Sequence, residues 1–299
     1  MSRQGLVLGL GLGAVGLLGL AVALREDEPV LPAGKFTTKR ALAARARGTR
    51  RQPMEWIDRV IERVSEHEGR YDSLNRNTDG AGLSFGILQW AQKTGDLGNL
   101  LAAMYGADAE AFQRILGARW YDVLKVARTP SLAAVDGAVL WREPWVSRFK
   151  EAGAWPVFQA VQRRMARDGA HFQGALEASR ILGVATERAM ALFFDTSVQQ
   201  GRGAAVQIAQ QVKDRYARAG RTTVPYDELL RAYAQRAADR LRTGKEPSSP
   251  PRSSHLRWEK VGEEWHLYAG SIDLYRGVHR RRFAILADQR LEDAPVAMV

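Results

Sequence analysis

PMEWIDRVIERVSEHEGRYDSLNRNTDGAGLSFGILQW, residues 53–90, is the stretch that decides the fold. Its first half predicts a helix that begins at Pro53, a residue favoured in the first helical turn, and ends at Gly69. The apolar residues on one face of this helix recur at intervals of three, four and seven, as in an amphipathic helix. They are Ile57, Val60, Ile61 and Val64.

Glu68 falls on the same face of the predicted helix. It follows Ile57 by eleven residues, which at about 100° per residue places the two within roughly 20° of each other. The other glutamates of the helix, Glu55, Glu62 and Glu66, fall on the opposite, solvated side. Partial burial and the negative end of the helix dipole both raise the pKa of a carboxyl, as a general acid for glycosidic cleavage requires. The alternative is a solvated glutamate at a fraying helix end.

The second half of the stretch is rich in turn-forming residues. Residues 72–86, DSLNRNTDGAGLSFG, place Asp79-Gly80 between two short segments. An Asp-Gly pair in this setting is typical of a hairpin or a tight loop.

Together these residues resemble the active-site signature of the lysozyme-like superfamily, which includes phage-type lysozymes, lytic transglycosylases and chitosanases. Its members share a catalytic glutamate at a helix end, a turn-rich hairpin and a Gly-hydrophobic-hydrophobic-Gln stretch. Here these features correspond to Glu68, residues 72–86 and Gly86-Ile87-Leu88-Gln89. The match covers about 25 residues, and no one subfamily fits the whole chain.

The resemblance implies catalytic roles for three residues. Glu68 matches the proton donor, and Asp79 falls where a second carboxylate often lies, although Asp-Gly is also a common turn pair. Ser84 matches a hydroxyl residue near the attacking water. Asp72 is the competing second carboxylate.

Further residues are expected to bind substrate. Gln89 matches a glutamine that lines the cleft of lytic transglycosylases, and Asn75 lies within the signature. Tyr71 and Trp90 could stack on sugar rings or belong to the core. Asp195 and Gln199, one helical turn apart, could line the far wall of a glycan cleft or satisfy helix-end carbonyls.

The rest of the chain predicts a mainly α fold, α+β in class, with two helical lobes and a small β-hairpin at the cleft. Helices are expected over 97–104, 109–127, 155–167, 174–182, 186–198, 203–217, 226–242 and 278–291, with a possible hairpin in 258–275. We expect the catalytic domain to span 53–292, with a flexible loop at 243–257, after a basic linker at 25–52.

The N-terminus predicts export. An apolar, Gly-rich run from Gly5 to Leu24 follows Arg3 and contains the small-x-small pattern Ala21-Val22-Ala23. Residues 1–24 therefore fit a signal peptide or a membrane anchor, which places the body in the periplasm or outside the cell. The chain contains no cysteine, which excludes disulfide scaffolds and thiol nucleophiles.

The net charge of the chain indicates which class of substrate to expect. The net charge of +11 and the pI near 10.2 favour anionic partners such as wall polymers or membrane surfaces. We therefore expect cleavage of β-1,4 bonds in peptidoglycan by a muramidase or a lytic transglycosylase, and rank the polycation chitosan second. A non-catalytic wall-binding module with the same fold is the rival outside enzymology.

Other classes of protein fit the sequence less well. Gly82-Leu83-Ser84-Phe85-Gly86 spells the nucleophile elbow of serine hydrolases, but no alternating strand-helix pattern surrounds it. His279-Arg280-Arg281-Arg282 suggests nucleic acid, which an exported protein would not meet. No metal-ligand spacing is present, so neither a metal nor another cofactor is expected.

Overall fold

The computed structural model describes residues 53–78, 80–129, 132–251, 256–269 and 271–298. The predicted export segment, residues 1–24, and the predicted linker, residues 25–52, lie outside the described residues. Within the described part, no helix combines the length and the apolar composition that a membrane span needs.

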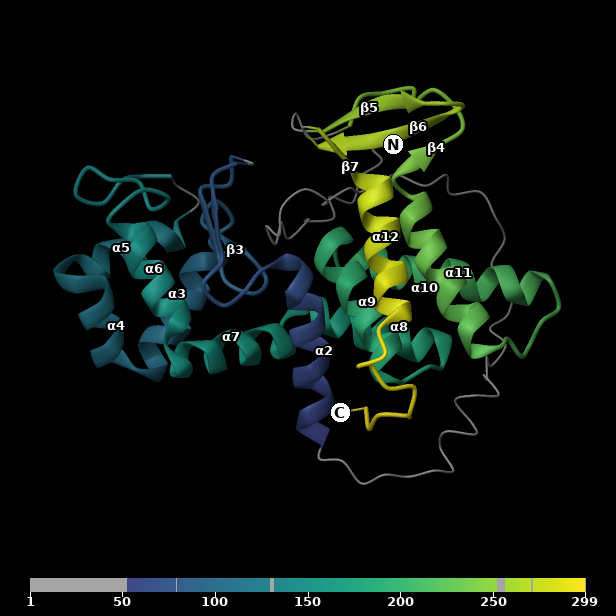
Figure 1. The fold of residues 1–299 in the computed structure, drawn as a ribbon, viewed down its shortest axis with the longest axis horizontal. Coiled ribbons are helices and arrows are strands. Elements are labelled where there is room, and N and C mark those ends of the chain that lie inside the picture. Colours follow the sequence, from purple (N-terminus) through teal and green to yellow (C-terminus); the bar gives the residue numbers. More distant parts are fainter. Residues whose placement is uncertain (1–52, 79, 130–131, 252–255, 270, 299) are drawn as a thin grey trace, which may run out of the picture.

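Two lobes, each with its own hydrophobic core, make up the molecule (Figure 1). The first lobe consists of helices α3 to α7, at the left of the view, and the small sheet next to them. Their bounds are α3 Asp96–Ala107, α4 Ala109–Leu116, the 3-10 turn η1 Gly117–Arg119, α5 Trp120–Arg128, α6 Trp145–Ala154 and α7 Pro156–Asp168.

The second lobe packs four helices and α2 around the central helix α9, all but two of whose residues are buried. Apart from α2, Pro53–Glu68, its helices are α8 Ala170–Leu182, α9 Glu187–Gln200, α10 Arg202–Arg218, α11 Tyr226–Asp239 and α12 Leu274–Ala287. Helix α7 joins the lobes, because its Phe158 and Val161 lie in the first core and its Ala166 lies in the second.

Two antiparallel sheets complete the fold. The first, in the order β1-β2-β3, contains β1 Leu74–Arg76, β2 Leu83–Phe85 and β3 Trp90–Ala91. The second lies over the N-terminal end of α12 (Figure 1). Its strands are β4 Arg242–Thr243, β5 Leu256–Val261, β6 Glu264–Ala269 and β7 Ile272–Asp273, in the order β4-β6-β5 with β7 paired to β6.

The amphipathic pattern predicted for the first helix is confirmed. In α2 the side chains of Ile57, Val60, Ile61 and Val64 are buried in the second core. Arg59, on the same helix, pairs with the buried Glu187 at the start of α9. Burial of the four apolar side chains contributes on the order of 1.5–3 kcal/mol each, so packing rather than propensity holds the helix.

Most predicted helices are confirmed within a few residues at each end. The region 109–127 divides into two helices because Gly117 adopts a positive φ of 72° and starts a 3-10 turn. Helix α6 was not predicted, although Trp145, Val146, Phe149 and Ala152 give it a buried face at helical spacing. The possible hairpin near the C-terminus is confirmed as β5 and β6.

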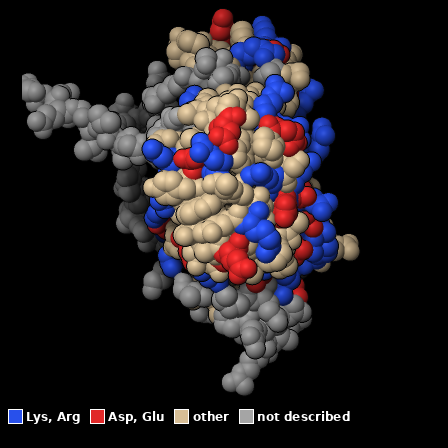
Figure 2. All heavy atoms as spheres, turned by 90° about the vertical axis from the view of Figure 1, so that its left-hand side faces the viewer, with Lys and Arg blue, Asp and Glu red and all other residues tan. Residues whose placement is uncertain are grey.

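Charge is distributed unevenly along the described part of the chain. Residues 53–170 contain 15 basic and 15 acidic residues, whereas residues 171–299 contain 20 basic and 15 acidic ones. On the face of the molecule drawn in Figure 2, the end of the first lobe, Lys and Arg alternate with Asp and Glu rather than forming one basic patch. The excess of positive charge thus belongs to residues 171–299 and to residues 1–52.

Candidate active site

The predicted general acid stands at the end of α2. The helix ends at Glu68, and the Gly69 amide still donates to the carbonyl of Ser65 at 2.8 Å. A Cβ on Gly69 would lie 2.9 Å from the Cβ of Ser73, so only glycine allows the chain to turn this tightly. The side chain of Glu68 lies outside what the structure describes, and its catalytic role stays a prediction.

The loop that carries Asp79 connects β1 and β2. Asn77, with a φ of 65°, accepts a hydrogen bond on its side-chain oxygen from the Gly82 amide at 2.9 Å and so closes the loop. Asp79 itself lies outside the described residues, and its role as the second carboxylate stays a prediction. Its competitor Asp72 lies 3.6 Å from Arg70 in an exposed ion pair.

Asn75 supports the same loop. Its side-chain oxygen accepts hydrogen bonds from the amide and the hydroxyl of Thr78, at 3.0 and 2.7 Å. Its backbone pairs with that of Ser84 across β1 and β2. These contacts give Asn75 a structural function in the turn, while its predicted contact with substrate stays a prediction.

Ser84 occupies the middle of β2. Its neighbours Leu83 and Phe85 point into the first core, so the serine side chain points to the opposite side of the sheet. It is buried, and its hydroxyl has no hydrogen-bond partner among the described residues. The strand belongs to a small antiparallel sheet and runs into a turn rather than a helix, so the serine-hydrolase elbow is absent.

Three residues predicted to bind substrate make contacts within the protein. Gln89 donates its side-chain amide to the carbonyls of Gly86 and Ser73, at 2.8 and 3.4 Å. The hydroxyl of Tyr71 accepts from Arg163 of α7 at 3.1 Å, and the partly buried Trp90 packs against both cores. Their predicted substrate contacts stay predictions beside these structural ones.

Asp195 was expected on the wall of a cleft, but the structure places its side chain fully buried in α9. It forms an ion pair with Arg281, and the Nε atom of Arg282 lies 3.7 Å from its Oδ2 atom. Gln199, one turn later, is half-buried. A carboxylate held by two guanidinium groups positions those groups rather than presenting itself to substrate.

Arg282 is an unusual member of this cluster. Its side chain is fully buried in α12, and its Nε atom donates to the Thr196 hydroxyl at 3.1 Å. Its two terminal nitrogens have no hydrogen-bond acceptor among the described residues. Burial lowers the pKa of Arg282 to about 10, so it stays protonated at neutral pH. Two positive charges therefore face one negative charge in the core.

The charges of Asp195 and Arg281 also act on the C-terminal end of α2. Burial lowers the pKa of His67, the neighbour of Glu68, and the positive charge of Arg281 lowers it further, against the opposing effect of Asp195. The end of the predicted catalytic helix thus lies in the field of the charges that α9 and α12 bring together.

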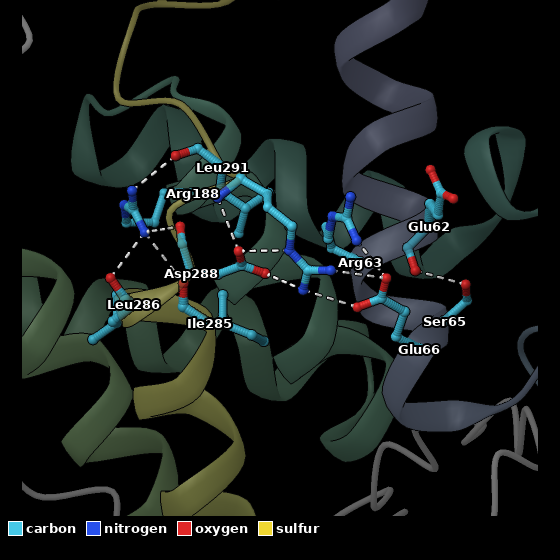
Figure 3. Close-up of polar contacts among 10 residues, drawn as sticks. Glu62, Arg63, Ser65, Glu66, Arg188, Ile285, Leu286, Asp288 and Leu291 are labelled. Atoms are coloured by element: carbon cyan, nitrogen blue, oxygen red, sulfur yellow. Dashed lines mark hydrogen bonds and ion pairs between the residues drawn. The ribbon is translucent and has the colours of Figure 1, made fainter.

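The C-terminal segment fixes α2 from its outer side (Figure 3). Glu66 pairs with Arg63 of the same helix and, at 3.0 Å, with Arg290, which also pairs with Asp288 at 2.8 Å. Arg188 of α9 donates to the carbonyls of Leu286, Asp288 and Leu291 at 2.7–2.9 Å. These contacts tie the end of α12 and the segment after it to α2 and α9.

Asp96 was not predicted as a site residue. It begins α3 in the first lobe, and its Oδ2 atom accepts from the Thr94 hydroxyl at 2.7 Å. Its charge acts on His171 of the second lobe, whose Nδ1 atom lies 2.8 Å from the Ser197 carbonyl oxygen. Burial lowers the pKa of His171, and the Ser197 contact and Asp96 oppose this. The charge of Asp96 in the first lobe thus acts on a histidine of the second lobe.

A sequence signal existed for Arg282 but not for Asp96. Val278, Arg282 and Ile285 are spaced by four and three residues, which is the helical periodicity from which Glu68 is predicted to lie on the apolar face of α2. By composition alone these arginines are only a basic run within the helix expected over 278–291. The place of Asp96 depends on how the two lobes meet, which no local pattern gives.

Comparisons with known proteins agree with this architecture. The sequence profile of glycosyl hydrolase family 46 matches residues 60–258, about two thirds of the chain. A native chitosanase from Bacillus subtilis MY002 shares the fold, with a TM-score of 0.51 and 16% identity over 80% of this chain and 89% of that one. A mutant of a chitosanase from the same source, complexed with 6 GlcN, gives the same values.

A family 46 chitosanase from Gynuella sunshinyii, in complex with chitotetraose, matches with a TM-score of 0.50 and 16% identity, over 80% of this chain and 89% of the other. No curated protein sequence matches the chain significantly. At this identity the structural matches establish the fold, and the expected lysozyme-like architecture is confirmed.

Proposed function

Because the chain belongs to glycosyl hydrolase family 46 and is thus a glycosidase of amino-sugar polymers, we propose that its substrate is chitosan. The bonds cleaved would be the β-1,4 bonds of the polymer. The observation that carries the proposal is the extent of the family match. It runs from the middle of α2 through the first sheet and helices of both lobes into β5, so it includes the three predicted catalytic residues but not α12. The solved structures of similar fold are chitosanases, one of them bound to chitotetraose.

The proposal ranks chitosan above peptidoglycan, which reverses the ranking that net charge suggested. Of the +11 net charge, +6 comes from residues 1–52, with nine basic and three acidic residues, and +5 from residues 171–299. Residues 53–170, which carry Glu68, Asp79 and Asp96, have no net charge. The repulsion expected between this protein and a polycation therefore does not apply to the half that supplies the predicted carboxylates.

In the proposed mechanism, Glu68 protonates the oxygen of the leaving sugar. Asp79 activates water on the opposite side of the bond or stabilises the oxocarbenium-like transition state. Asp96, whose charge acts on His171 of the other lobe, is our candidate for attracting the ammonium group of a glucosamine unit. Asp195, with Arg281 and Arg282, sets the electrostatic field at the end of α2.

The test is a direct comparison of substrates. Purified protein is incubated with soluble chitosan and, separately, with peptidoglycan, and the products are identified by mass spectrometry. We expect glucosamine oligomers with intact reducing ends from chitosan and slower release from peptidoglycan. Faster cleavage of peptidoglycan would favour a muramidase, and 1,6-anhydro products would favour a lytic transglycosylase.

We also propose export of the protein by residues 1–24, on the sequence grounds given above. Chitosan is a polymer that lies outside the cell membrane, so the proposed export agrees with the proposed substrate. Fusion of residues 1–24 to a reporter that is active only in the periplasm should yield activity. A reporter that remains in the cytoplasm would contradict the proposed export.

A further inference from the structure

Gln162 is a polar side chain in an unusual place. It belongs to α7, the helix that joins the lobes, and follows Val161 of the first core. Its side chain has no exposed surface. A buried amide must have its hydrogen bonds satisfied, since each unmet group destabilises the fold, so its partners indicate why it is there.

Those partners are two backbone segments of the candidate site. The Gln162 Nε2 atom donates to the carbonyl of Tyr71 at 3.0 Å, and its Oε1 atom accepts from the amide of Ile87 at 3.0 Å. Tyr71 follows Glu68 by three residues, and Ile87 follows Ser84 by three. One side chain thus bridges the chain leaving α2 and the chain leaving β2.

The surrounding packing makes this bridge rigid. The Gly86 amide donates to the Ser73 carbonyl at 2.9 Å, which joins the same two segments directly. A Cβ on Gly86 would collide with the Gln162 amide, and Gly86 has a φ of 83°. The next residue of α7, Arg163, bonds to the Tyr71 hydroxyl. The two segments therefore meet α7 at a defined distance.

We propose that Gln162 is a positioning residue that sets the spacing between the end of α2, with Glu68, and the strand and loop that carry Ser84 and Asp79. The inference rests on the proposed function. Spacing matters because a glycosidase needs its acid and its water-activating group at defined places on either side of the bond. A misplacement of about 1 Å at a catalytic group can lower the rate by about 10²-fold.

Glutamine suits this position because an amide donates and accepts at once. Methionine has a similar size but makes neither bond, and an ionised glutamate accepts from Ile87 but cannot donate to Tyr71. The matched control is Gln159, one turn earlier in α7, whose amide donates only to the Gly153 carbonyl at 3.0 Å.

The test compares Gln162→Met, Gln162→Glu and Gln159→Met on soluble chitosan. We expect both changes at Gln162 to lower kcat at least 10-fold, with KM within about twofold of the parent, and Gln159→Met to leave both nearly unchanged. Combined with Glu68→Gln, the change Gln162→Met should lower the residual rate no further, because it acts through Glu68. A loss confined to KM, or an equal further loss in the Glu68→Gln background, would overturn the proposal.

A second measurement does not depend on activity. Hydrogen exchange of the Ile87 amide, followed by NMR, should be slow in the parent and at least 10-fold faster in Gln162→Met, but not in Gln159→Met. If the parent cleaves no chitosan, the proposed function fails, and the exchange rates still decide whether Gln162 holds the segment. Equal exchange in the parent and in Gln162→Met contradicts the proposed positioning.

Discussion

Helices α2 and α12 share a sequence pattern but use it differently. In each, an apolar stripe passes through one charged residue, Glu68 in α2 and Arg282 in α12. Glu68 is the last residue of its helix, where the chain turns toward the first sheet. Arg282 lies in the interior of its helix, is fully buried, and lies beside Asp195 and Thr196.

The difference shows what position along a helix decides. A charged residue in the interior of a buried helix has to be paired within the protein, since desolvation of an unpaired charge is costly. A charged residue at a helix end has the option of facing a substrate. The first arrangement fits a positioning role and the second fits the catalytic role predicted for Glu68, so one local pattern is compatible with two functions.

Loss of the shared counter-ion should have the largest effect on this arrangement. Asp195→Asn leaves the guanidinium groups of Arg281 and Arg282 in the core without a carboxylate. We expect the free energy of unfolding to fall by about 3–5 kcal/mol, the usual cost of breaking a buried ion pair from one side. Urea unfolding followed by circular dichroism measures it, and a loss below about 1 kcal/mol would contradict the pairing.

A smaller effect is expected where the segment after α12 reaches α2. Hydrogen bonds from Arg290 lower the pKa of Asp288 to about 2, and Arg290 also pairs with Glu66 of α2 (Figure 3). A lowered carboxyl pKa stabilises the fold above pH ~4, and this contribution is lost as the pH falls through about 2. Asp288→Asn should therefore cost about 1 kcal/mol at pH 7, since the site is partly solvated.

The pH dependence provides the check on Asp288. The difference in stability between the parent and Asp288→Asn should shrink as the pH falls from 4 toward 2, measured by thermal unfolding at each pH. A difference that stays constant over this range would mean that the Asp288 carboxylate contributes nothing through its charge.

The smallest change in stability is expected at Arg282 itself. Arg282→Met removes a buried charge whose terminal nitrogens lack acceptors among the described residues, and leaves Arg281 paired with Asp195. Replacement of buried ionic groups by apolar ones of similar size is often neutral or stabilising. We expect a change within about 1 kcal/mol of the parent, with lower activity because the field at α2 changes. A loss as large as that of Asp195→Asn would show that the two arginines are equally required.

The sequence was informative wherever the signal was local. The stripe of α2 and the turn formers of residues 72–86 predicted the helix, its end and the first sheet, and the resemblance they carry led to the superfamily. Helix α6 was within reach of the same reasoning, because Trp145, Val146 and Phe149 form a buried face.

What the sequence did not reveal depends on contacts between distant segments. Gln162 meets Tyr71 and Ile87 across 91 and 75 residues, and Arg282 meets Thr196 across 86. Periodicity predicts which face of a helix is buried but not which helix covers it. Net charge is a poor guide to substrate for a related reason, since it sums residues that lie far from the candidate site.

The structure also changes the choice of control for a substitution of Glu68, the predicted catalytic residue. Both Glu62 and Glu66 lie on the solvated side of α2, as their spacing predicts. Glu66 nevertheless pairs with Arg63 and Arg290 and so helps to fix the helix. Glu62, which is exposed, is the better match for a change that should leave rate and stability unaltered.

The most direct measurement is the rate of chitosan cleavage by Glu68→Gln beside that by Glu62→Gln, with folding verified by circular dichroism. Glutamine keeps the shape of the side chain but has no proton to transfer to the leaving oxygen. We predict a fall of at least ~10²-fold for Glu68→Gln, the low end for loss of a general acid, and a rate within about twofold of the parent for Glu62→Gln. Parent-like cleavage by Glu68→Gln would contradict the account.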